Sequence, residues 1–168
     1  PRERSKLKSV VARQFNFQFA GSPENLALLL SSHGWQEAEP ANWRWTILSM
    51  NPEVTELSLP PLKKDYVGHV DILLLHRLGG DPSAQETLRL WDSGVRLTPG
   101  GESVYLGQVT GEVLVQRMMV FSYWRAIPAS RTDMGQLERE AAGLQTTWGN
   151  ESLLLIREAQ APESVAEH

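Results

Sequence analysis

The residue types that could do chemistry in this sequence are arginines that stand beside tryptophans. The chain has six tryptophans in 168 residues, which is a high number for its length. An exposed Arg–Trp pair can stack a ring or a sugar, whereas in a core the arginine stem covers the edge of a buried indole. The core arrangement is favoured. The pairs best placed for a functional surface are Arg89 with Trp91 and Trp124 with Arg125.

Two acidic residues, Asp71 and Glu112, could add acid–base chemistry to this surface. With Arg89 as a phosphate clamp they would suit a phosphoester hydrolase, because a guanidinium fork pairs with two oxygens at once. That chemistry requires all three side chains to point into one pocket, and sequence spacing does not give their separations. The candidate functional surface is therefore Asp71, Arg89, Trp91, Glu112, Trp124 and Arg125.

The histidines predict neither a metal site nor a hydrolytic triad. His69, Asp71 and His76 are of ligand types, but along a continuous strand positions 69 and 71 face one way and position 76 the other. The sequence also lacks glycine-rich phosphate loops and a Gly-x-Ser-x-Gly elbow. It has no cysteine, which excludes disulfides, thiolate catalysis and Cys-type zinc sites. We therefore expect no metal and no cofactor.

The elements that must position these residues begin with a strand and a helix. Phe15, Phe17 and Phe19 alternate with polar residues, which predicts a strand with all three rings on one buried face. Ser22 is placed to cap the helix that follows, and Gly34 is placed to end it.

The rest of the chain predicts further strands and helices. The remaining expected elements are a short helix at 41–50, strands at 69–77, 86–92, 103–110 and 117–126, a helix with Asp133 at its start, and a strand at 152–157. The fold class is therefore α+β: a mostly antiparallel sheet with two or three helices packed on it, in the order β-α-(α)-β-β-β-β-α-β.

Length and charge predict one domain between two polar ends. Residues 13–158 form the single α+β domain, 1–12 a basic N-terminal segment, and 159–168 a disordered acidic tail. The basic segment is either a solvated terminus or a juxtamembrane segment. Because the chain starts with Pro rather than Met, we expect it to be a piece of a longer protein. Sixteen Lys and Arg against twenty Asp and Glu argue against nucleic acid as a partner.

Several segments together resemble the LssY-like C-terminal domain family, over roughly residues 14–145. The matching stretches are FAGSPENLALLLSSHGW, GHVDILLL, LRLW, VYLGQVTGE and DMGQLERE. Asp71 matches a family aspartate, and Arg89 with Trp91 matches an Arg-x-Trp motif. The chain departs from the family pattern at Thr87, where the pattern has a histidine, and at Glu112, where it has an aspartate. A His-His pair before the last helix is also missing.

The resemblance implies a soluble domain that trails a membrane portion of the DedA type or the PAP2 lipid-phosphatase type. On that basis we expect a non-catalytic accessory or regulatory domain at the cytoplasmic face of the membrane, within a longer protein that handles lipids or lipid phosphates. Its expected partners are its own membrane portion or anionic lipid headgroups. The alternatives are a small-molecule or headgroup-binding module on the Trp/Arg surface, or the hydrolase described above.

Overall fold

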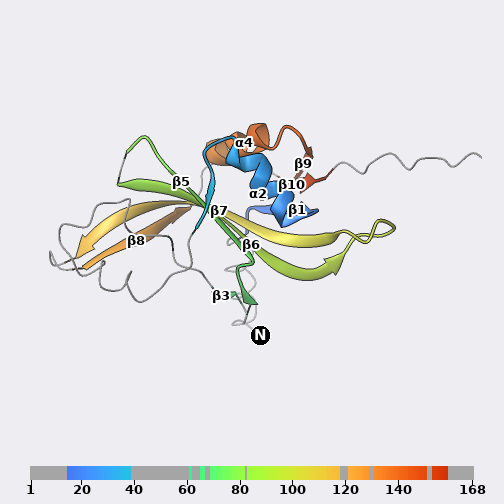
Figure 1. Ribbon diagram of the computed structural model, residues 1–168, viewed down its shortest axis with the longest axis horizontal. Helices are drawn as coiled ribbons and strands as arrows, with labels where there is room; N and C mark the ends of the chain where they lie inside the picture. Colours follow the sequence, from blue (N-terminus) through green and yellow to red (C-terminus); the bar gives the residue numbers. More distant parts are fainter. Residues whose placement is uncertain are drawn as a thin grey trace, which may run out of the picture.

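A sheet of eight strands dominates the computed structural model, in which two described helices pack on the sheet (Figure 1). The structure describes residues 15–38, 61, 65–66, 69–81, 83–117, 121–128, 131–150 and 153–158. In chain order the elements are β1 (Phe17–Ala20), α2 (Pro23–Ser31), β2 (Gln36–Glu37), β3 (Asp65–Tyr66), β4 (His69–Val70), β5 (Leu73–Leu78), β6 (Ala84–Arg96), β7 (Ser103–Arg117), β8 (Phe121–Pro128), α4 (Arg131–Glu140), β9 (Gln145–Asn150) and β10 (Leu153–Arg157). The fold is therefore α+β. The helix expected at 41–50, the basic N-terminal segment and the acidic tail lie outside the described residues.

The long antiparallel pair β6 and β7 is the centre of the sheet, whose strand order is β2-β5-β6-β7-β1-β10-β9. One edge of β7 is shared, because β1 pairs with Val104–Gly107 and β8 pairs with Thr110–Arg117. Asn16 fills the junction between these partners: its Nδ2 donates to the Val109 carbonyl at 2.7 Å, and the Val109 N–H donates to its Oδ1 at 2.8 Å. The sheet is mixed because β1 and β10 run parallel.

Several expected strands differ from the structure in extent or pairing. The strands expected at 86–92 and 103–110 lie within the longer β6 and β7, and the strand expected at 117–126 begins only at Phe121, because Arg117 still belongs to β7. The strand expected at 69–77 is interrupted: β4 pairs with β3 in a separate two-stranded sheet, Asp71 turns inward and is buried, and β5 begins at Leu73. The strand expected at 152–157 does not stand alone but forms a hairpin with β9, and β10 lies between β9 and β1. The polar stretch QTTWGN of β9 lacks the apolar run that marks a buried strand.

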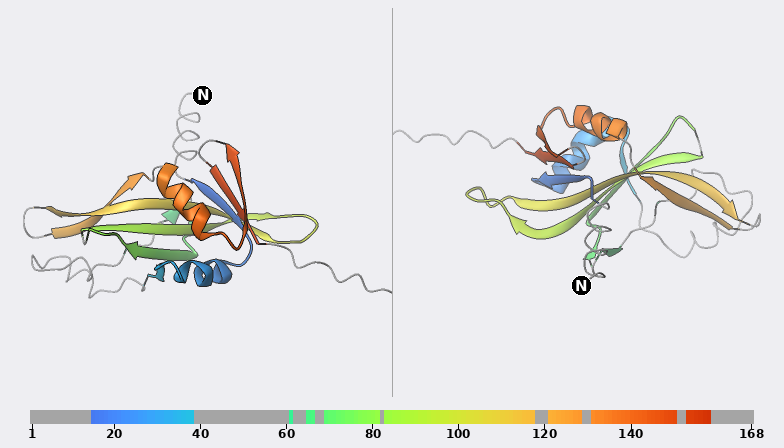
Figure 2. Two further views of the ribbon diagram at one scale, coloured as in Figure 1. Left: turned by 90° about the horizontal axis from the view of Figure 1, so that it is seen from above. Right: turned by 180° about the vertical axis from the view of Figure 1, so that it is seen from behind.

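The helix α2 begins as its sequence predicts. Ser22 is its N-cap, with the Asn25 N–H donating to Ser22 Oγ at 3.4 Å. Gly34, beyond its end, has a φ of 84°, a left-handed conformation that favours glycine. Figure 2 shows both helices on the same face of the sheet. Because apolar side chains recur on one side of each helix, each buries an apolar stripe there.

The hydrophobic core lies between this face and the helices. It joins Leu26 and Leu30 of α2 and Met134 and Leu137 of α4 to the strand residues Phe17, Phe19, Leu73, Leu75, Leu88, Leu90, Val109, Leu154 and Ile156. The ring of Phe17 lies directly over Gly107, its partner on β7, where a Cβ would collide with the ring. The prediction for Phe15 was wrong. Phe15 precedes β1 and packs edge-on against Trp91 on the opposite face, with ring centroids 5.5 Å apart.

Candidate functional site

The sheet face turned away from the helices carries a buried polar cluster. Along β6, Leu88 and Leu90 point into the core, so the alternating residues point to the other face. Those residues are Gln85, Thr87, Arg89 and Trp91, with exposed fractions of 3%, 0%, 1% and 1%. Full burial of an arginine is rare unless its charge is paired.

Arg89 is paired with two carboxylates. Its Nη1 donates to Asp71 Oδ2 at 3.1 Å, and its Nη2 donates to Glu112 Oε1 at 3.2 Å. The three side chains are 1%, 0% and 4% exposed, respectively. The break between β4 and β5 turns Asp71 inward, and β7 carries Glu112. The hydrolase alternative required these three residues to meet, and they do, but inside the protein and with Arg89 bonded to both carboxylates.

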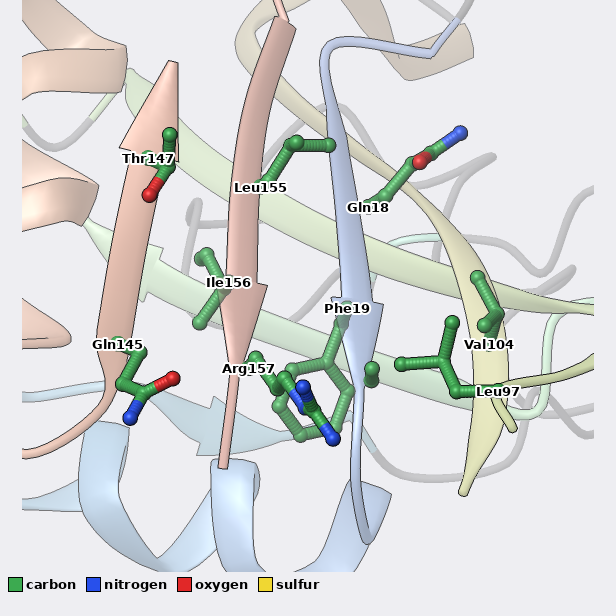
Figure 3. Close-up of a pocket in the computed structure, with 10 residues that line it drawn as sticks. Gln18, Phe19, Leu97, Val104, Gln145, Thr147, Leu155, Ile156 and Arg157 are labelled. Carbon is green, nitrogen blue, oxygen red and sulfur yellow. The ribbon is translucent and has the colours of Figure 1, made fainter. Parts of the chain in front are cut away.

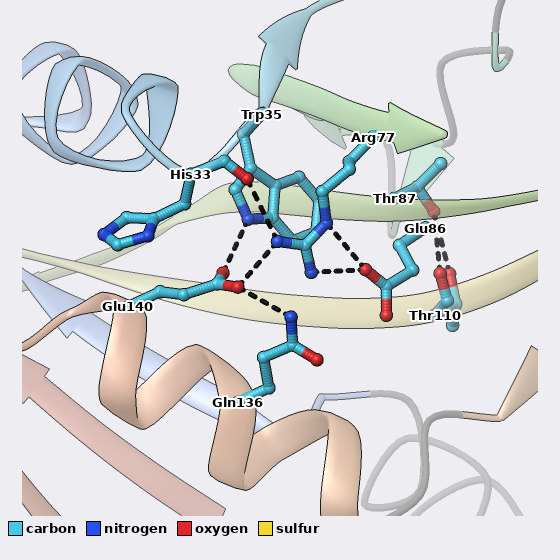
Figure 4. A network of polar contacts seen from close by, with 8 residues as sticks. All are labelled: His33, Trp35, Arg77, Glu86, Thr87, Thr110, Gln136 and Glu140. Atoms are coloured by element: carbon cyan, nitrogen blue, oxygen red, sulfur yellow. Dashed lines mark hydrogen bonds and ion pairs between the residues drawn. The ribbon is translucent and has the colours of Figure 1, made fainter. Parts of the chain in front are cut away.

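Uncharged and titratable groups surround this ion cluster. Gln85 Nε2 donates to Glu112 Oε2 at 2.9 Å, and the hydroxyls of Thr87 and Thr110 are 2.9 Å apart (Figure 4). His76, opposite Thr87 on β5, shares the face. Burial lowers the pKa of His76, while its hydrogen bond with Gln85 and the charge of Glu112 act in the opposite direction.

The other three predicted site residues do not form an exposed functional surface with this cluster, although Trp91 shares the face of Arg89. Trp91 is buried against Phe15 and does not form a surface. Trp124 is half-buried on β8 opposite Leu114, and Arg125 is exposed opposite Val113, which places it on the other face from Glu112. The charged residues of the expected functional surface, Asp71, Arg89 and Glu112, thus form a cluster in the protein interior.

The strand-parity argument about the histidines was wrong in its geometry. His76 lies on the same face as the Asp71–Arg89 pair, whereas His69 is exposed, because the chain breaks its alternation at Asp71. Within the described ranges, no group of three or more metal-ligating side chains is arranged to hold a metal ion.

A second polar network, which sequence reasoning missed, joins the two helices on the core side. Arg77 Nη1 donates to Glu140 Oε1 at 2.6 Å and to the His33 carbonyl at 3.2 Å, and Arg77 also pairs with Glu86 (Figure 4). The guanidinium lies 4.5 Å from the ring centroid of Trp35, whose Nε1 donates to Glu140 Oε2 at 2.8 Å.

This network keeps Glu140 ionised. Burial would raise the pKa of Glu140, but hydrogen bonds from Trp35, Arg77 and Gln136 outweigh it, and the pKa lies below its usual range. Burial would lower the pKa of Arg77, but its hydrogen bonds with Glu140 and Glu86 and their negative charges outweigh that effect, and the pKa is raised. The members of the network come from the turn after α2 and from β5, β6 and α4, so no local motif could have revealed it.

A hollow of about 350 Å³ lies at the β9–β10–β1 end of the sheet (Figure 3). Its lining residues are Gln18, Phe19, Ala20, Leu97, Val104, Gln145, Thr147, Leu155, Ile156 and Arg157. Arg157, which is 38% exposed, donates from Nε to Glu102 Oε2 at 2.9 Å. None of the lining residues is a tryptophan, and none of them is among the site residues predicted from the sequence.

Comparison with known proteins identifies a family. A family model described as the LssY C-terminus matches residues 1–129. None of the curated proteins and none of the solved structures matches the chain. Among the described residues, no helix has both the length and the apolar character needed to cross a membrane.

Proposed function

We propose, on the premise that this chain belongs to the LssY C-terminus family, that it is a non-catalytic accessory or regulatory domain of a membrane-anchored protein. That protein handles lipids or lipid phosphates and carries a membrane portion of the DedA or PAP2 type. The domain lies at the cytoplasmic face. Its partner is this membrane portion or the anionic headgroups beside it.

The observation that carries the non-catalytic part is the state of Arg89. Its two terminal nitrogens already donate to Asp71 and Glu112, and the side chain is 1% exposed. A phosphate entering this site would have to displace one carboxylate and would still meet the negative charge of the other. Removing one partner from such a cluster also leaves a buried charge uncompensated. The cluster therefore suits a structural role better than a phosphate clamp.

The two alternative functions have less support. A phosphoester hydrolase requires Asp71, Arg89 and Glu112 to face a substrate, and all three are buried. A binding module built on the tryptophans requires exposed indoles, yet Trp91 is buried and Trp124 is half-buried.

Cell fractionation tests the membrane-anchored part of the proposal. An antibody raised against the chain is used to blot fractions of native cells. We expect a band well above 18.8 kDa in the membrane pellet, which resists alkaline washing and is released by detergent. A soluble band at the mass of the chain itself would overturn the membrane proposal.

An activity assay tests the non-catalytic part. The chain is incubated with phosphomonoester and phosphodiester substrates, with and without divalent cations, and we expect no turnover. Turnover that disappears in a folded Asp71→Asn variant, and survives in His33→Gln, would show that the ion cluster is catalytic.

A further inference from the structure

We propose that the hollow at the β9–β10–β1 end of the sheet binds an amphipathic anion. The ligand class is a single phosphate or carboxylate carried on a short apolar group. None of the residues that line the hollow belongs to the Arg89 cluster, so this inference does not depend on the proposed function.

The anionic part of the ligand is assigned from Arg157. Its side chain is 38% exposed, and the bond from Nε to Glu102 holds the guanidinium at one nitrogen. Among the described residues, the two terminal nitrogens of Arg157 have no hydrogen-bond partner. A guanidinium fixed through Nε offers its remaining N–H groups as a planar fork, which matches two oxygens of a phosphate or carboxylate.

The apolar part of the ligand is assigned from the walls. Leu97 and Val104 of the β6–β7 hairpin form one side of the hollow, and Leu155 of β10 forms another (Figure 3). All three side chains are half-buried, so each retains apolar surface in contact with water that a ligand would cover. Gln18, Gln145 and Thr147 supply a polar rim.

The volume limits what can enter. About 350 Å³ lies at the low end of the roughly 300–1,000 Å³ typical of ligand sites. One small amphiphile, or the headgroup and first chain segment of one lipid, fits this size. The carboxylate of Glu102 already pairs with the positive charge of Arg157. We therefore expect a modest affinity that depends on both the anionic and the apolar part of the ligand.

The probe is octyl phosphate, titrated below its micelle concentration and followed by two-dimensional NMR of the whole chain. We expect shifts at amides of β1, β9 and β10, and weaker binding of inorganic phosphate and of octanol. Arg157→Gln should lower the affinity about tenfold, because a charge-assisted pair is lost. Arg157→Lys keeps the positive charge but lacks the planar guanidinium, so its affinity should lie between those of the wild type and Arg157→Gln.

Arg96→Gln is the matched control. Arg96 is exposed on the same hairpin, donates to the Gly101 carbonyl at 3.3 Å and does not line the hollow. The Arg96→Gln substitution removes a positive charge from the same region and should change the affinity for octyl phosphate less than twofold. Equal losses in Arg96→Gln and Arg157→Gln, equal binding of octanol, or shifts confined to other strands would overturn the proposal.

Vesicles distinguish the source of the ligand. Sedimentation with phosphatidylcholine vesicles containing phosphatidic acid, weakened by Arg157→Gln, would support the site and identify a membrane lipid. Binding of octyl phosphate without sedimentation would support the site and identify a free molecule. Because this test uses only the chain and its ligands, its failure is distinguishable from failure of the fractionation experiment.

Discussion

Arg89 and Arg157 lie on the same face of one sheet but in opposite surroundings. Arg89 is 1% exposed and touches two carboxylates at 3.1 and 3.2 Å, whereas Arg157 is 38% exposed and touches one at 2.9 Å. Taking an ion out of water costs several kcal/mol, so a buried arginine persists only where its charge is matched. A half-exposed arginine keeps part of its hydration and can exchange water for a ligand.

The difference separates structural chemistry from binding chemistry. In the Arg89 cluster the charged groups pair with one another. These pairs link Asp71, at the break before β5, to β6 and β7. The Arg157 pair leaves nitrogens and neighbouring apolar surface available. Arg77 is intermediate, at 15% exposure, and uses its contacts to join the two helices. Substitutions at these sites should therefore differ in both size and pH dependence.

Arg89→Met should have the largest effect. It leaves Asp71 and Glu112 buried without their counter-charge, and breaking a buried pair in this way costs about 3–5 kcal/mol. Urea denaturation measures the loss in the free energy of unfolding. Replacing all three residues with uncharged ones of similar size should be less damaging than Arg89→Met alone. A loss below about 1 kcal/mol for Arg89→Met would remove the contrast with Arg157.

Glu140→Gln should follow, with a loss of about 2 kcal/mol at neutral pH, because charged hydrogen bonds become neutral ones. Since the folded-state pKa of Glu140 is lowered, its contribution is complete above the unfolded value near 4.3 and is lost as pH falls through the folded value. The gap between wild type and variant should therefore shrink below about pH 4. Unfolding curves at several pH values measure it, and a gap independent of pH would contradict the ionised network.

His76→Gln should change the pH dependence in a higher range. Burial lowers the folded pKa of His76, so the unfolded chain binds the proton more readily. Wild-type stability should therefore be complete above the unfolded pKa near 6.5 and fall as pH drops through it, by at most about 1.4 kcal/mol per pH unit. His33→Gln, an exposed site, is the control. Parallel curves for wild type and His76→Gln between pH 5 and 7.5 would contradict this.

Arg157→Gln should have the smallest effect on stability, below about 1 kcal/mol, because exposed ion pairs contribute little. The same urea measurement sets it directly against Arg89→Met. A loss of unfolding free energy as large as that of Arg89→Met would mean that Arg157 has a structural role, and the contrast between the two arginines would no longer hold.

Local sequence alone determined several parts of this protein. The cap at Ser22, the left-handed glycine at Gly34 and the last helix with Asp133 in its first turn depend on residues within a few turns of one another, and the structure contains all three. The combined motifs also identified the family, which the family model confirms. The strand expected at 86–92 lies within β6.

Tertiary structure alone decided what those residues do. Asp71, Arg89 and Glu112 come from three segments, and their contact depends on strand register and on the break before β5, which parity along one strand cannot reveal. Phe15 changed faces because β1 starts only at Phe17. The hollow around Arg157 exists because β10 inserts between β1 and β9, a pairing between residues far apart in sequence. Local preferences act over a few residues, whereas burial and charge pairing are set by whichever segments the packed sheet brings together.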